Sequence, residues 1–205
     1  MALQNFYKKG VLEAGCDEAG RGCLAGPVFA AAVMFPPGYA NPDLNDSKKL
    51  KAEKRNELRK IIENDAMAYA VAKVDPEEID ELNIFKASII AMHRAIEQLS
   101  PLPEHLLIDG KYFYKYKSIS HTCVVKGDSK FLSIAAASIL AKTYRDDFMM
   151  ELHEQYPEYN WYRNKGYPTS QHREAIKSEG ITRFHRKSFR LLPEAYRRNW
   201  MFKSN

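Results

Sequence analysis

Three short apolar runs of this chain each lead into acidic residues, and this pattern restricts the folds that the chain can adopt. The runs, with the acids that follow them, are 11–16 with Asp17 and Glu18, 106–108 with Asp109, and 122–125 with Asp128. Short apolar runs that alternate with helical segments are typical of buried strands in a sheet with parallel pairs. Ligands of such sheets gather beyond the carboxyl ends of the strands. We therefore predict an α/β fold in which these four carboxylates converge.

The first acidic pair is followed by a glycine-rich turn. Neighbouring side chains of a strand point to opposite faces, so Asp17 and Glu18 reach one ligand only if the strand ends there. Gly20 and Gly22 permit such a turn, and their missing side chains let Arg21 and backbone N–H groups approach a phosphate or a sugar. The alternative is an acidic pair in an exposed hairpin.

Four converging carboxylates require a positive charge among them, because mutual repulsion and desolvation otherwise raise their pKa values or open the site. An all-oxygen ligand set suits Mg²⁺ or Mn²⁺, which keep several waters and share oxygens of a bound phosphate. Two such ions about 4 Å apart position a water for in-line attack and stabilise the leaving oxygen. This chemistry indicates phosphodiester hydrolysis.

The remaining pattern predicts helices and strands in alternation. The clearest helix runs from Phe85 to Leu99, where apolar residues recur every three or four positions. The other predicted elements are strands at 11–16 and 28–35, a helix at 52–64, a strand at 66–74, a short helix after Asp75-Pro76, and a long alanine-rich helix at 131–156.

Basic charge is concentrated at the end of the chain. Residues 160–205 hold 11 Lys and Arg against 3 Asp and Glu, whereas the whole chain has a net charge of +5. The segment also carries the aromatic residues Trp161, Tyr162, Tyr167, Phe184, Phe189, Tyr196, Trp200 and Phe202. Such a mixture is typical of nucleic-acid contact, where phosphates are neutralised and bases or sugars are stacked upon. The alternative is a solvated helical surface with its aromatic residues in the core.

Membrane and secreted classes are disfavoured. No apolar run reaches membrane-spanning length, and the first residues lack the basic-then-apolar pattern of a signal peptide, so we expect a cytoplasmic protein. The three cysteines, Cys16, Cys23 and Cys123, form no paired motif and are expected to be reduced thiols. The six histidines have no metal-ligand spacing and are expected at the surface or as capping groups.

Six ordered blocks of the sequence carry a resemblance to one family. The chain resembles a bacterial type 2 ribonuclease H, ribonuclease HII. The blocks are 17–22 (DEAGRG), 44–50 (LNDSKKL), 79–84 (IDELNI), 107–110 (LIDG), 125–129 (VKGDS) with 133–142 (SIAAASILAK), and 165–169 (KGYPT).

The resemblance implies a ribonuclease H-like fold, with a central mixed sheet flanked by helices and a helical C-terminal portion. It implies a catalytic domain at 1–157 and a substrate-binding portion at 158–205, joined in one compact unit. It also implies cleavage of the RNA strand of RNA–DNA hybrids, and of a lone ribonucleotide in duplex DNA, leaving a 3′-hydroxyl and a 5′-phosphate. No obligate protein partner is evident, and a monomer is expected.

Roles follow for particular residues by the same resemblance. The acidic metal-site residues are Asp17, Glu18, Asp109 and Asp128. The turn formed by Gly20, Arg21 and Gly22 recognises the ribose 2′-hydroxyl at an RNA-to-DNA junction, and Tyr167 stacks on the adjoining deoxyribose. Lys48 and Lys49 are assigned phosphate contact. One departure is Cys23, where many relatives have proline.

Two rival functions stay open at this point. One is another metal-dependent nuclease of the same superfamily, such as a junction resolvase. The other is a nucleic-acid-binding module without catalysis, whose expected mark is a missing carboxylate, yet all four are present.

Overall fold

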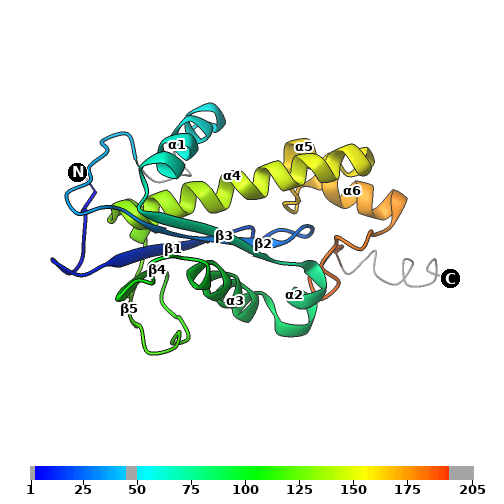
Figure 1. Cartoon of the computed structure of the whole chain (residues 1–205). Helices are drawn as coiled ribbons and strands as arrows, with labels where there is room; N and C mark the ends of the chain where they lie inside the picture. Colours follow the sequence, from blue (N-terminus) through cyan, green and yellow to red (C-terminus); the bar gives the residue numbers. More distant parts are fainter. Residues whose placement is uncertain (1–2, 45–49, 194–205) are drawn as a thin grey trace.

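The computed structural model describes residues 3–44 and 50–193, and within them it shows a five-stranded mixed sheet with helices on both faces (Figure 1). The strand order is β3-β2-β1-β4-β5. Strand β2 pairs antiparallel with β1 and with β3, whereas β4 pairs parallel with β1 and with β5. The strands are β1 Glu13–Ala19, β2 Val28–Met34, β3 Ala68–Val74, β4 His105–Asp109 and β5 Ser120–Val124. The predicted α/β class and mixed sheet are confirmed.

The helices divide between the two faces of the sheet. Figure 1 shows the long helix α4 along one face, with α1 outside it, and α3 against the other face. The helices are α1 Ala52–Asp65, α2 Pro76–Leu82, α3 Ile84–Glu97, α4 Leu132–Gln155, α5 Trp161–Asn164 and α6 Ser170–Glu179, with short 3₁₀ turns η2 Gly127–Ser129 and η3 Pro157–Tyr159. Among the described residues, no helix is both long and apolar enough to cross a membrane.

Small side chains let the two helical layers approach the sheet closely. Along β2 the alternation of the strand sends Ala30 and Ala32 toward α3, and Ala31 and Val33 toward α4. Strand β2 is buried along its whole length, as a central strand covered on both faces must be. At Gly15 of β1, an added Cβ would overlap the backbone of the first turn of α4.

One predicted boundary is wrong. The sequence predicts that the first strand ends at Cys16, but β1 continues through Asp17 and Glu18 to Ala19, because β2 pairs with it as far as Ala19 opposite Phe29. The other acids lie as expected at the carboxyl end of the sheet. Asp109 is the last residue of β4, and Asp128 lies in η2, shortly after β5.

The C-terminal segment 161–193 packs on the far end of α4 and on the loop between β1 and β2. The N–H of Leu24 donates to the carbonyl of Gly166, the N–H of Gly26 to Phe184, and the N–H of Arg186 back to Leu24 (2.8, 2.8 and 2.9 Å). Residues that are distant in sequence are thereby joined by their backbones.

The aromatic residues of this segment divide between core and surface. Trp161 is fully buried and Phe184 packs on the same cluster, so for these two the core alternative is right. Tyr162 and Tyr167 remain exposed. Tyr196, Trp200 and Phe202 lie outside the described residues.

We expect Gly15→Ala to destabilise the protein by about 3 kcal/mol or more, because its methyl group meets backbone rather than a movable side chain, and overpacking of this kind is costly. Urea unfolding followed by circular dichroism measures the change. Gly22→Ala is the matched control, since nothing lies within 4 Å of its added Cβ. Equal stability of the two variants would contradict the close packing of β1 and α4.

Candidate active site

Strand β1 parts from β4 at the point where its acids begin. The parallel pairing of β1 and β4 ends at Cys16 opposite Ile108, whereas the pairing of β1 with β2 continues. In this opening, the N–H of Glu18 donates a hydrogen bond to the carboxylate of Asp17 (2.7 Å). The first acidic pair therefore lies in a seam between two strands, at the place where the direction of strand order changes.

The two neighbouring acids face opposite sides of the sheet, as strand geometry requires. Asp17 is buried and accepts a hydrogen bond from Ser138 of α4. Glu18 lines a pocket on the α3 side and forms an ion pair with Arg21 (3.0 Å). The seam nevertheless couples the two carboxylates electrostatically, since the charge of Glu18 raises the pKa of Asp17.

Asp17 marks the point of strongest electrostatic stress. Its pKa lies well above the usual value of 3.8, first because it is buried and then because Glu18 and Asp109 place negative charge beside it. Hydrogen bonds from Ser138 and from the Glu18 N–H act in the opposite direction. Two of the other predicted acids, Glu18 and Asp109, are therefore close enough to Asp17 to repel its negative charge.

The fourth acid is joined to this group through the backbone. The N–H of Gly127 donates to the carboxylate of Asp109 (2.6 Å), and this places the η2 turn, with the buried Asp128, next to the end of β4. An added Cβ at Gly127 would overlap Ile134 of α4, so glycine allows the turn to lie this close to the helix.

A pocket of about 320 Å³ opens at these acids. It is lined by the acids Glu18 and Asp109, by Arg21 from the glycine turn, by Phe85, Ser88, Ile89 and Met92 of α3, and by Gly110, Lys111 and Tyr112 after β4. Both charge signs therefore meet in one cavity, as binding a phosphate beside a metal ion requires.

The donor set fits a hydrated divalent cation better than a closed metal cage. Among the described residues, no three acidic, histidine or cysteine side chains are arranged so that they alone could hold a metal ion. Mg²⁺ and Mn²⁺ need no such cage, since they keep waters and take substrate phosphate oxygens as ligands. The raised pKa of Asp17 agrees with this, because a bound cation would offset both the burial of its charge and the repulsion from Glu18 and Asp109 that raise it.

Two buried arginines hold the glycine turn and the residues that follow it. Arg145 of α4 donates to the carbonyls of Ala25, Pro27 and Lys165, and Arg186 donates to those of Arg21 and Gly26. Both side chains are fully buried, and burial lowers the pKa of Arg186 to about 10. Their described acceptors are all backbone carbonyls.

The two glycines of this turn serve different purposes. Gly20 has φ +95, and an added Cβ there would overlap the guanidinium of Arg145. At Gly22 the space beside the backbone is open, so a ligand can come directly against the main chain. The side chain of Arg21 is half-exposed beside it.

Tyr167 stands next to the same turn. Its ring is 41% exposed, and the guanidinium carbon of Arg145 lies 6.0 Å from the ring centre. Its hydroxyl lies against the thiol of Cys23, and burial together with that contact raises its pKa. The preceding Gly166, at φ +81, would overlap the carbonyl of Ala25 if it carried a Cβ.

The histidines behind Tyr167 correct the expectation of surface histidines. His172 and His185 are buried, as is His105 in β4. Trp161 Nε1 donates to His172 Nε2 (3.0 Å), and the Thr182 N–H donates to His185 Nδ1 (3.0 Å). These donors leave His185 Nε2 to donate to His172 Nε2 (3.3 Å), and His172 Nδ1 to donate to the Tyr167 carbonyl (2.9 Å).

Lys48 and Lys49, which the sequence assigns to phosphate contact, lie outside the described residues. Cys16, Cys23 and Cys123 are free thiols, as expected.

Comparison with known proteins decides the family. The model of the family described as Ribonuclease HII matches residues 14–192. A Ribonuclease HII of Parabacteroides distasonis is 66% identical over 192 residues, which cover 94% of this chain and 96% of that protein. The chain belongs to the ribonuclease HII family. It is therefore an endoribonuclease that hydrolyses RNA–DNA hybrids.

Solved structures agree on the fold. The ribonuclease H2 of Pyrococcus horikoshii OT3 has a TM-score of 0.74 at 25% identity, covering 94% of this chain and 99% of that one. The ribonuclease HII of Archaeoglobus fulgidus, solved in a complex with PCNA, has a TM-score of 0.71 at 26% identity, covering 90% and 98%. A Bst ribonuclease HIII in complex with Mn²⁺ shares the fold with a TM-score of 0.67. It is 18% identical, and the match covers 88% of this chain and 68% of that one. The ribonuclease H-like fold is confirmed, and the family's dependence on divalent metal ions is consistent with this acidic site.

Sequence reasoning missed several residues that shape this ribonuclease HII site. Ser138 lies in the sequence block 133–142, and the sequence gives no sign of its role, which is to donate a hydrogen bond from α4 to Asp17. Arg145 and Arg186 look like ordinary basic residues of helix and tail. The spacing of His172 and His185 gives no signal, because their partners come from other segments.

The histidine pair makes stability depend on pH. Burial, and then the neighbouring His172, lower the pKa of His185 from 6.5 to about 3. The unfolded chain binds a proton at His185 below pH 6.5, whereas the folded chain does not, so stability is complete above pH 6.5 and falls as the pH drops toward 3. At pH 5 the free energy of unfolding is lower by about 2 kcal/mol on account of His185.

We therefore expect the melting temperature to fall between pH 7 and pH 5, and to fall less in His185→Asn, which keeps an acceptor for the Thr182 N–H. Differential scanning calorimetry at both pH values measures this, with His121→Asn as the control outside the network. A variant whose loss equals that of the wild type would show that the proton is taken up elsewhere.

Proposed function

We propose that this ribonuclease HII recognises the junction between ribose and deoxyribose, and that it cuts 5′ of a single ribonucleotide embedded in duplex DNA as well as within hybrids. The observation that carries the proposal is the backbone hydrogen bond from Leu24 to Gly166, which joins the glycine turn to the Tyr167 loop. Two elements that could read adjacent sugars are thereby held as one rigid surface beside the acids.

Asp17, Glu18, Asp109 and Asp128 would hold two divalent ions, Mg²⁺ or Mn²⁺. Bound there, the ions supply an activated water and neutralise the leaving oxygen. The protein's own part is placement: Ser138 orients Asp17, and Gly127 orients Asp109. Hydrolysis breaks the bond between phosphorus and the 3′-oxygen, so the products carry a 3′-hydroxyl and a 5′-phosphate.

Recognition of ribose falls to the glycine turn. The open space at Gly22 lets the backbone come against a 2′-hydroxyl, the group that distinguishes RNA from DNA. The fully buried Arg145 and Arg186 add positive charge beneath the turn without side chains in the way. Gly20 and Arg21 complete this surface, and Arg21 also balances the charge of Glu18.

Tyr167 would stack on the deoxyribose that follows the ribose. Its half-exposed ring is held by Arg145, by the Cys23 thiol and by the histidine network behind its carbonyl. This support makes it a stiff platform, so little entropy is lost when substrate binds. Lys48 and Lys49 would contact phosphate nearby.

The same proposal covers surroundings and partners. We place the enzyme in the cytoplasm, acting as a monomer on nucleic acid without an obligate protein partner. The Archaeoglobus relative was solved with PCNA, so light scattering of this chain, alone and with a sliding clamp, is the direct measurement.

Asp109→Asn should lower turnover by several orders of magnitude and leave hybrid binding nearly unchanged, because charge at the metal is lost while shape is kept. The variant retains an oxygen that can accept the Gly127 N–H. Single-turnover cleavage and fluorescence anisotropy measure the two quantities. Glu151→Gln, which removes an exposed acid from α4, is the charge-matched control. Turnover of Asp109→Asn within tenfold of wild type at saturating metal would refute the assignment.

Tyr167→Ala should lower cleavage at a single embedded ribonucleotide by about tenfold to a hundredfold, and Tyr167→Phe should keep most activity, because the ring carries the stacking. Rates on duplexes that differ in one 2′-hydroxyl measure this, with melting temperature as the control for folding. Equal impairment of both variants would contradict a stacking role.

Gly22→Ala tests the other half of the junction surface. Its added methyl group should depress cutting at the ribonucleotide far more than binding of plain DNA, because it occupies space that the 2′-hydroxyl needs. Cleavage and binding are measured on the same duplex with and without the ribose. A variant that loses both equally would show that Gly22 serves general binding.

A further inference from the structure

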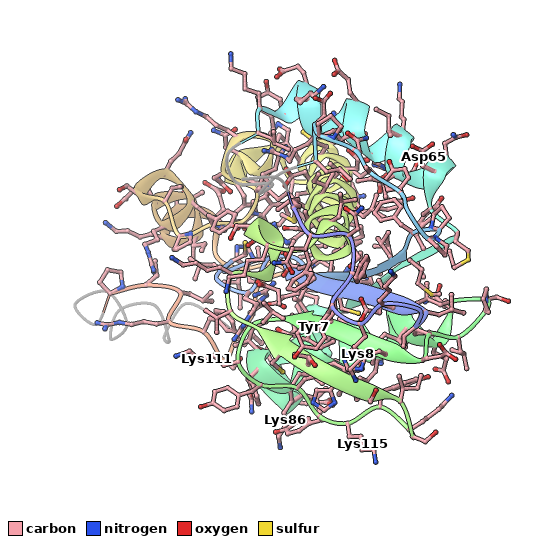
Figure 2. The ribbon with its side chains drawn as sticks, turned by 90° about the vertical axis from the view of Figure 1, so that its left-hand side faces the viewer. Tyr7, Lys8, Asp65, Lys86, Lys111 and Lys115 are labelled. Atoms are coloured by element: carbon pink, nitrogen blue, oxygen red, sulfur yellow. The ribbon has the colours of Figure 1, made fainter. Side chains whose placement is uncertain are left out.

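A second basic and aromatic surface lies on the other side of the acidic pocket. It is formed by the loop after β4 together with the first turn of α3, and we call it the lysine–tyrosine patch: Lys86, Lys111, Tyr112, Tyr114 and Lys115. Figure 2 shows Lys86, Lys111 and Lys115 in the lower half of the molecule, with Lys111 toward the left and Lys115 at the bottom. All five residues are exposed.

The two tyrosines of the patch are displayed outward on an aromatic support. Tyr112 is 72% exposed and Tyr114 is 51% exposed. Both meet Phe85 of α3 edge to face, with ring centres 6.4 and 5.8 Å apart. Large aromatic rings held in place and yet open to solvent are suited to stacking rather than to core packing.

The lysines of the patch are available for an anion. Within the described residues, Lys86, Lys111 and Lys115 have no carboxylate partner, whereas the neighbouring Lys117 is paired with Glu97 (3.6 Å). Three positive charges without a carboxylate partner, two of them in one loop, raise the local concentration of a polyanion.

The patch is continuous with the catalytic pocket. Lys111 and Tyr112 line the cavity that also contains Glu18 and Asp109, and only Gly110 separates Asp109 from Lys111 in the chain. A strand whose phosphate lies at Asp109 therefore has Lys111 and Tyr112 beside it in the same cavity.

We propose that the lysine–tyrosine patch is a binding site for the flanking nucleotides of the strand being cut. Lys111 and Lys115 contact its phosphates, and Tyr112 and Tyr114 stack on its bases or sugars. The inference rests on the proposed placement of the scissile strand at Asp109. A polynucleotide is favoured over an acidic protein surface because any occupant of the patch shares the cavity with the substrate.

The test compares Lys111→Ala/Lys115→Ala with a control of equal charge change, Lys9→Ala/Lys60→Ala, whose exposed lysines lie on the N-terminal segment and on α1. Binding of an RNA–DNA hybrid is measured by anisotropy across a salt series in EDTA, so that no cleavage occurs. Each lost phosphate contact makes the slope of log affinity against log salt less steep by about 0.9. The slope of the patch variant should therefore be shallower than that of wild type by about 2, and the slope of the control should be almost unchanged.

The tyrosines are tested separately at one salt concentration. Tyr112→Ala/Tyr114→Ala should weaken hybrid binding about tenfold or more with the salt slope unchanged, and Tyr112→Phe/Tyr114→Phe should bind like wild type. An unchanged salt slope in the lysine variant, or an equal fall in the control, would overturn the proposal, and the second outcome would indicate general electrostatic attraction. Because binding is read without catalysis, a failure of junction-specific cleavage would leave these results intact.

Discussion

The structure depends on the seam where β1 and β4 separate. Parallel pairing ends at Cys16 opposite Ile108, and immediately beyond it the chain places Asp17 and Glu18 on one strand and Asp109 on the other. Negative charge is costly there, because burial removes Asp17 from water and because Glu18 and Asp109 place further negative charge beside it, and both effects raise its pKa. A cluster of buried carboxylates is unfavourable without a positive charge among them, so a divalent cation is the natural means of compensating it.

The glycine turn is held by an unusual choice of partners. A buried guanidinium is commonly paired with a carboxylate, yet Arg145 and Arg186 donate to backbone carbonyls of the turn and of the C-terminal segment. Carbonyl acceptors satisfy the donors without cancelling their charge. The same hydrogen bonds that fix the turn therefore leave positive charge close to Arg21, which lines the pocket of Glu18 and Asp109.

Much of the site could be predicted because its elements are encoded locally. Apolar runs that end in Asp109 and precede Asp128, and a glycine-rich turn after Asp17 and Glu18, are visible without knowing what packs where. The length of β1 was not predicted, because its last residues are strand only through pairing with β2. The expectation of a surface position was wrong for His172 and His185 for a similar reason, because their hydrogen-bond partners are not visible from the spacing of the histidines.

Trp161 and Tyr167 mark the boundary between what the sequence determined and what tertiary structure decided. The sequence by itself determined the α/β class and the family, and it indicated the four acids and the glycine turn as the candidate site. Both aromatic residues lie in the same basic stretch, but Trp161 is buried beneath Tyr159 and the histidine pair, while Tyr167 faces outward beside the glycine turn. Local composition cannot separate them, because burial depends on which surfaces meet, and that is decided only when the C-terminal segment docks on α4 and on the loop after β1.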